Sequence, residues 1–83
     1  MVARGRVQGV FFRASLQRLA QERGVSGFAC NRDDGSVEAV FEGPAEAVEE
    51  LIAYAAEGPR DADVSHLDVT EEEPEGLSGF ATG

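Results

Sequence analysis

The 83-residue sequence contains no lysine, one cysteine and one histidine. A Walker-type phosphate loop ends in Gly-Lys-Ser or Gly-Lys-Thr, so the absence of lysine excludes that motif. A single cysteine cannot form an internal disulfide, which fits a reducing compartment. No apolar run approaches the length of a membrane span, and no leader of charged and then apolar residues begins the chain. We therefore expect one small cytoplasmic domain, residues 1–83.

Three other phosphate-handling motifs are also missing. The dinucleotide fingerprint needs a third glycine, and Arg13 stands close to the expected place. A thiolate phosphatase would need an arginine six residues after its cysteine, yet Ser36 stands six residues after Cys30. Residues 61–63, Asp-Ala-Asp, suggest an aspartyl-phosphate enzyme, but no apolar strand precedes them. The residues also offer no catalytic triad and no metal cluster, so we expect neither a metal nor a cofactor.

Charge is divided unevenly along the chain, which has a net charge of −9 and an isoelectric point near 4.3. Residues 1–36 hold six arginines and three acids, whereas residues 37–83 hold thirteen acids and one arginine. A strongly acidic body argues against nucleic acid or an anionic membrane as partner. The basic N-terminal half would still attract a small anion locally.

The stretch from Gly5 to Arg13, GRVQGVFFR, combines two glycines with an arginine. Glycine permits backbone conformations in which several N–H groups point to one concave side. If a helix follows, its N-terminus adds partial positive charge, and Arg13 adds a planar fork suited to two oxygens. The stretch indicates an oxyanion site. From the residues alone, a plain strand-to-helix turn with a solvated arginine remains the alternative.

Two later stretches have apolar residues at helical spacing. The first contains Phe12, Leu16, Leu19 and Ala20 and ends at Gly24. The second contains Val48, Leu51, Ile52 and Ala55 and lies between Pro44 and Gly58. Proline suits a helix start and glycine a helix end, so we expect two helices with one buried face each.

Strands are expected at residues 1–4, 25–30, 37–42, 63–71 and 80–82, with Leu67 and Val69 on one face of the fourth. Asp34-Gly35 predicts a hairpin turn between the second and third strands. Residues 71–76, rich in glutamate, should form an exposed loop. The order βαββαβ with a terminal strand predicts an α+β, ferredoxin-like sandwich: an antiparallel sheet with two helices on one face.

GRVQGVFFR resembles the signature of the acylphosphatase family. Later pieces resemble the family in the same order, namely GVSGF at residues 24–28, Asn31, DGSVEA at residues 34–39, Gly43 and Gly58-Pro59. The resemblance extends from Gly5 to Phe80 and implies the same fold. Phe28 replaces a tryptophan often found in the family, and the segment before the loop is shorter than usual.

The resemblance implies a metal-independent hydrolase of small acyl phosphates. Backbone N–H groups of the loop would bind the phosphoryl group, from Arg6, Val7, Gln8, Gly9 and Val10. Arg13 would bind it through its guanidinium, and Asn31 would position the attacking water. From the sequence alone, an ordinary turn residue that hydrogen-bonds its own backbone is the favoured role of Asn31, and the resemblance reverses this preference. We expect a monomer.

Other functions are weighed against hydrolysis. A non-catalytic anion-binding or regulatory module would have no need of Asn31. An acylphosphatase-like domain excised from a larger carbamoyl-phosphate-handling enzyme finds support only in the short N-terminal segment. An RNA-binding module can have the same order of elements, but this chain lacks the positive net charge and the paired strand aromatics of such a module. We expect structural roles for His66 and Cys30, because His66 is far in sequence from the loop and Cys30 should point to the opposite sheet face from Asn31.

The acidic surface with arginine but no lysine predicts adaptation to high salt. Repulsion among carboxylates should weaken the fold at low ionic strength, and molar salt shortens the Debye length to about 3 Å. The thermal unfolding midpoint, followed by circular dichroism, should therefore rise from low to molar potassium chloride. An unchanged or falling midpoint would contradict the hypothesis.

Overall fold

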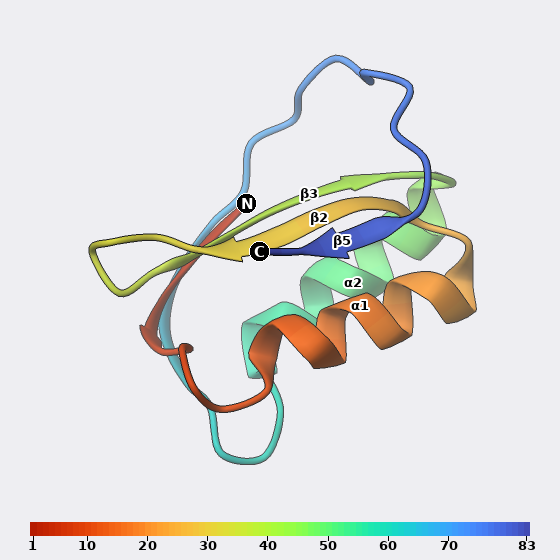
Figure 1. The fold of residues 1–83 in the computed structure, drawn as a ribbon. Helices are drawn as coiled ribbons and strands as arrows, with labels where there is room; N and C mark the ends of the chain where they lie inside the picture. Colours follow the sequence, from red (N-terminus) through yellow and green to blue (C-terminus); the bar gives the residue numbers. More distant parts are fainter.

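The computed structural model describes all residues from 1 to 83 as a single sheet covered by two helices (Figure 1). The sheet has five strands in the order β4-β1-β3-β2-β5, and both helices lie on one of its faces. The elements are β1 Val2–Arg6, α1 Phe12–Arg23, β2 Ser26–Asn31, β3 Val37–Glu42, α2 Ala45–Glu57, β4 Asp63–Asp68 and β5 Phe80–Thr82. This order confirms the ferredoxin-like prediction.

The sheet is mixed, whereas the sequence predicted antiparallel pairing. The neighbours among β1 to β4 pair antiparallel as expected, but β5 runs parallel to β2, with Gly27 opposite Phe80. The reason is the β4–β5 connection, residues 69–79, which leads the chain from one edge of the sheet to the other. Figure 1 shows this connection as a wide arch before β5 enters beside β2.

The helices largely bury the faces that their apolar spacing predicted, with an exchange in each: in α1, Leu19 is only half-buried, whereas Ser15 is buried. The buried helix residues are Phe12, Ser15, Leu16 and Ala20 in α1, and Ala47, Leu51 and Ala55 in α2. Val48 and Ile52 are only half-buried, because they line a pocket at the side of α2 instead of the centre of the core. Ala47 takes the core place that the spacing assigned to larger side chains.

Strand β4 is shorter than predicted. It ends at Asp68, which lies opposite Val2, the first residue of β1. Beyond this point β4 has no neighbouring strand to continue the ladder, so residues 69–71 leave the sheet. Val69 is therefore 50% exposed and does not share a buried face with Leu67.

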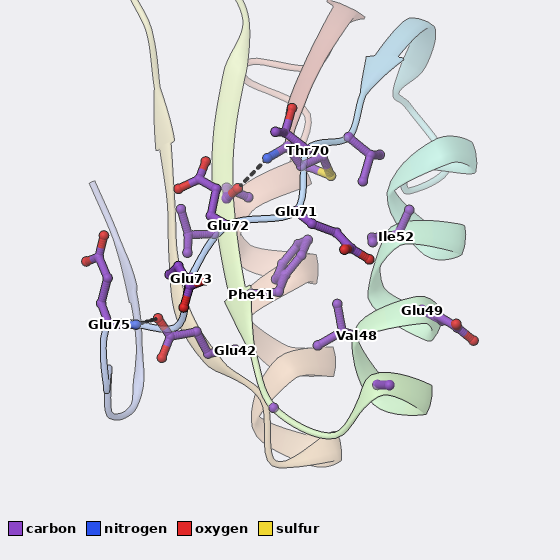
Figure 2. Close-up of a pocket in the computed structure, with 16 residues that line it drawn as sticks. Phe41, Glu42, Val48, Glu49, Ile52, Thr70, Glu71, Glu72, Glu73 and Glu75 are labelled. Carbon is purple, nitrogen blue, oxygen red and sulfur yellow. Dashed lines mark hydrogen bonds between the residues drawn. The ribbon is translucent and has the colours of Figure 1, made fainter.

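The β4–β5 connection is exposed at residues 71–76, as predicted, and one carboxylate holds it to the sheet. Glu42, at the end of β3, accepts hydrogen bonds from the N–H groups of Glu75 at 2.7 Å, Gly76 at 3.1 Å and Leu77 at 3.0 Å. These bonds lower the pKa of Glu42. Figure 2 shows the contact with Glu75 at the edge of a pocket of about 350 Å³ between β3, α2 and the connection.

Gly27 in β2 has no room for a side chain, and this gives a prediction about stability. Its φ is +144°, and an added Cβ would lie 1.8 Å from the carbonyl oxygen of Val40 in β3. Gly27→Ala should therefore destabilise the fold by about 3 kcal/mol, because the backbone must move. Urea unfolding of the variant measures this loss.

Gly76→Ala is the matched control, because Gly76 has a φ of +77° but open space around it. It carries the backbone strain without the clash and should cost only about 1 kcal/mol. Equal losses in the two variants would show that the close approach of β2 and β3 at Gly27 does not limit stability.

Candidate active site

The β1–α1 loop, Val7–Phe11, turns the chain from the sheet into α1. Val7 anchors it, since its side chain is buried and its N–H donates to the carbonyl oxygen of Gly5 at 3.1 Å. Gly9 has a φ of +72° with nothing within 4 Å of the place of a Cβ, and Phe11 has a φ of +64°. Two left-handed residues so close together fold the loop back toward the start of the helix.

A row of backbone donors is left free by this turn. None of the N–H groups from Gln8 to Ala14 donates to an acceptor within the chain, and no side chain caps α1. The first turn of any helix has such unpaired N–H groups, and here the loop extends the row. The partial positive charge of the helix N-terminus lies at the same place. The arrangement suits a phosphate or carboxylate.

Gly5, the first glycine of the signature, serves the sheet and lies outside the loop. It is part of β1, at an irregularity in the pairing with β4 between Arg4 and Gly5. An added Cβ would lie 2.3 Å from the carbonyl oxygen of Asp63. The glycine is therefore required by the close approach of β4, which sets where the loop begins.

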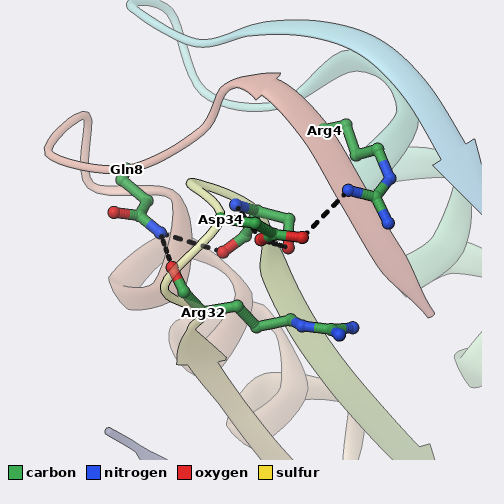
Figure 3. Close-up of polar contacts among 5 residues, drawn as sticks. Arg4, Gln8, Arg32 and Asp34 are labelled. Atoms are coloured by element: carbon green, nitrogen blue, oxygen red, sulfur yellow. Dashed lines mark hydrogen bonds and ion pairs between the residues drawn. The ribbon is translucent and has the colours of Figure 1, made fainter.

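Gln8 connects the loop to the turn between β2 and β3. Its side-chain nitrogen Nε2 donates to the carbonyl oxygens of Arg32 at 2.8 Å and Ser36 at 2.9 Å (Figure 3). The Gln8 side chain therefore does not point into the site, although its N–H is one of the free donors. Because the turn follows Asn31 directly, this bridge fixes Asn31 relative to the loop.

Asp34 stabilises the same turn from within. Its carboxylate accepts bonds from the hydroxyl and the N–H of Ser36, and Arg4 in β1 donates to it at 3.1 Å (Figure 3). The hydrogen bonds from Ser36, assisted by Arg4, hold the pKa of Asp34 well below its usual range. Two independent contacts, from Gln8 and from Arg4, thus join the turn to β1 and its loop.

Arg13 and Asn31, the two predicted catalytic residues, meet at one acceptor. Arg13 lies in the first turn of α1, and its Nη1 donates to the carbonyl oxygen of Gly83. The backbone N–H of Asn31, the last residue of β2, donates to the same oxygen at 3.4 Å. Arg13, near the start of α1, and Asn31, at the end of β2, are thereby brought together at one end of the sheet.

The loop, α1 and the end of β5 enclose a pocket of about 300 Å³. Its lining residues are Val7, Gly9, Phe11, Phe12, Arg13, Ala14, Gln17 and Thr82. Sequence reasoning did not find the contribution of β5. Gln17 donates to the carbonyl oxygen of Phe80 at 2.8 Å, which fixes β5 against α1. A three-residue strand has too little pattern to reveal its neighbours.

Of the predicted site residues, Arg6, Gln8, Val10 and Asn31 do not line this pocket. Arg6 is exposed at the end of β1, opposite Asp63. His66 is exposed on the edge strand β4 and contacts Asp68 at 2.9 Å. Cys30 is half-buried. No group of three or more His, Cys, Asp or Glu side chains is arranged to hold a metal ion.

The comparisons with known proteins identify the family. A family model described as Acylphosphatase matches residues 1–82. The chain belongs to the acylphosphatase family. The acylphosphatase of Haloquadratum walsbyi is 57% identical over 76 residues, which are 92% of this chain and 82% of that protein. The activity of the present chain is accordingly that of an acylphosphatase, the hydrolysis of an acyl phosphate to a carboxylate and inorganic phosphate.

Solved structures of other proteins share the fold. The acylphosphatase from Bacillus subtilis has a TM-score of 0.93 at 36% identity, with 99% of this chain and 92% of that chain covered. Full-length HypF, solved in a phosphate- and nucleotide-bound form, has a TM-score of 0.87 at 26% identity. This chain covers only 11% of that larger protein.

Neither α1 nor α2 has the length and the apolar character that a membrane-spanning helix requires.

The depressed pKa of Asp34 predicts how the turn responds to acid. The ionised carboxylate is favoured in the folded state, so its stabilising effect is complete above the unfolded pKa of about 4. It is lost as the pH falls below that value toward the lower folded pKa. Asp34→Asn should therefore be less stable than the wild type at neutral pH, and the difference should shrink under acid. Urea midpoints at several pH values measure it, and a constant difference would contradict the assignment.

Proposed function

We propose that the chain hydrolyses acyl phosphates by in-line attack of a water molecule that the side-chain amide of Asn31 holds. In this proposal the phosphoryl group lies against the free N–H groups of the β1–α1 loop and the Arg13 guanidinium. The observation that carries it is the row of unpaired donors that begins at Gln8 and runs into the helix N-terminus, of which Gly9, Phe11 and Phe12 line one pocket with Arg13. An amide can accept a hydrogen bond from water without protonating it.

The chemistry asks little of the protein beyond positioning and charge neutralisation. The water oxygen forms a bond to phosphorus, and the bond from phosphorus to the acyl oxygen breaks. The carboxylate leaves with the electron pair, and a phosphate oxygen takes the proton of the water. Backbone donors and Arg13 stabilise the charge on the phosphoryl oxygens. A carboxylate is a good leaving group, so the proposed reaction uses neither a metal nor a protein nucleophile.

Arg13 is held before substrate arrives. The bond from its Nη1 to the carbonyl oxygen of Gly83 fixes the side chain at the mouth of the loop. A guanidinium has five N–H donors, so one bond to a carbonyl leaves others for phosphate oxygens. The side chain therefore needs little reordering on binding, which lowers the entropic cost of forming the charged contact.

Loop N–H groups contribute unequally in this proposal. Those of Gln8, Gly9 and Val10 are free, whereas that of Val7 already donates to Gly5. We assign phosphate binding chiefly to the first three. Arg6, exposed at the end of β1, would attract the anion by its charge. The loop and Arg13 belong to residues 1–36, the half of the chain that holds six of the seven arginines.

A binding module is the second candidate. HypF is a larger protein in which a unit of this fold occurs, so the fold alone is not evidence of a stand-alone hydrolase. The presence of Asn31 beside Arg13 favours hydrolysis, because binding an anion requires no water-positioning amide.

The surroundings in which the protein works are also part of the proposal. We infer a cytoplasmic monomer adapted to high salt, without nucleic acid or membrane partners. Support comes from the excess of acids and from the relative in Haloquadratum walsbyi, a halophilic archaeon. Small acyl phosphates are the substrates that the proposal implies.

Benzoyl phosphate hydrolysis, measured with a chelator present in low and molar salt, tests the mechanism. Arg13→Ala should lower kcat/KM by about 1,000-fold, because the charged fork is lost. Arg13→Lys should recover little, since a point charge does not replace the fork. Asn31→Ala should lower kcat by about 100-fold with a smaller effect on phosphate inhibition.

Arg18→Ala is the matched control, because Arg18 is an exposed arginine of α1 outside the pocket. It should change kcat/KM by less than about 2-fold, which is typical of a screened surface charge. Circular dichroism confirms that each variant is folded. If the folded wild type were inert at every salt concentration but bound phosphate, the binding-module function would replace hydrolysis.

A further inference from the structure

Phe11 exposes an aromatic ring that the fold does not use. Its side chain is 77% exposed, and only Val69 among the other large apolar residues is also exposed. Phe11 is absent from the core and from the apolar residues packed against it. The ring nevertheless lines the pocket that holds Arg13 and Gly9. It therefore forms an edge of the phosphate pocket.

The backbone of Phe11 makes the choice of residue more unusual. Its φ of +64° and ψ of +19° are left-handed, and it is the one non-glycine residue of the chain with a positive φ. Glycine or asparagine adopts this conformation with less strain. Neither would expose apolar surface at this place. The stability of the fold therefore favours glycine or asparagine at this position. A role in binding would explain why a phenylalanine is present instead.

We infer that the Phe11 ring is the contact surface for the acyl group and favours acyl phosphates with an apolar or aromatic acyl substituent. The inference rests on the proposed function, because it requires the phosphoryl group to lie in the β1–α1 loop. Phe11 follows the free donors of Gln8, Gly9 and Val10 directly in the chain. A bound phosphoryl group would thus lie within a side-chain length of the ring.

The leaving group then meets Phe11 as the one large apolar side chain of the pocket that is exposed. The acyl carbon is separated from phosphorus by a single oxygen, so its substituent must leave the pocket close to the phosphate. Arg13 and the backbone donors are polar, while Phe11 offers an aromatic face or edge. Ring–ring contacts and burial of the exposed ring both favour an aryl substituent over a methyl group.

The test compares benzoyl phosphate with acetyl phosphate as substrates of the same enzyme. Phe11→Asn removes the ring and suits the left-handed backbone. It should lower the ratio of kcat/KM for benzoyl phosphate to that for acetyl phosphate by about 10-fold. Phe11→Tyr keeps the ring and should leave the ratio within about 2-fold of the wild type. The inhibition constant of inorganic phosphate reports on the loop itself in each variant.

Val69→Asn is the matched control, because it removes the other exposed apolar side chain far from the pocket. Its ratio should equal that of the wild type. An unchanged ratio in Phe11→Asn, or an equal loss in Phe11→Tyr, would overturn the inference while hydrolysis itself stands. If the wild type hydrolysed neither substrate, the proposed function would be the part that fails, and the inference would fall with it.

Discussion

Unpaired backbone N–H groups are the feature on which the other parts of the site depend. A buried donor without an acceptor is costly, but at the open end of a helix the same donors remain available to solvent or to an anion. The neighbouring structure keeps them free by using other groups for support: Gly5 packs against β4, Val7 anchors the loop, and the Gln8 side chain bonds to the opposite turn. Rigidity comes from side chains, and binding capacity stays with the backbone.

Sequence patterns predicted the elements well where they are long and periodic. The spacing in α1 and the alternation in β3 both follow from burying one face, so both were found with nearly correct limits. The end of β4 and the parallel entry of β5 were not found, because each depends on which strand lies alongside. Pairing between distant segments leaves no trace in a local pattern.

The site, like the fold, was predicted only in the parts that depend on local sequence. Arg13 and the loop were predicted from the residues, and the role of Asn31 came from the family resemblance. Their meeting at the carbonyl oxygen of Gly83 was not predictable, since it requires β5 beside β2. The left-handed conformation of Phe11 was also invisible, because a phenylalanine gives no local signal for it.

The Glu42 carboxylate of β3 also affects the conformational entropy that is lost when β5 pairs with the sheet. By fixing residues 75–77, it divides the β4–β5 connection and leaves only Ser78 and Gly79 between an ordered point and β5. Closing a shorter loop costs less conformational entropy, so a strand of three residues can stay paired at the sheet edge. The acceptor that holds Arg13 follows that strand. A carboxylate at one end of the sheet therefore supports, through β5, the acceptor of the arginine at the other end, without any contact between them.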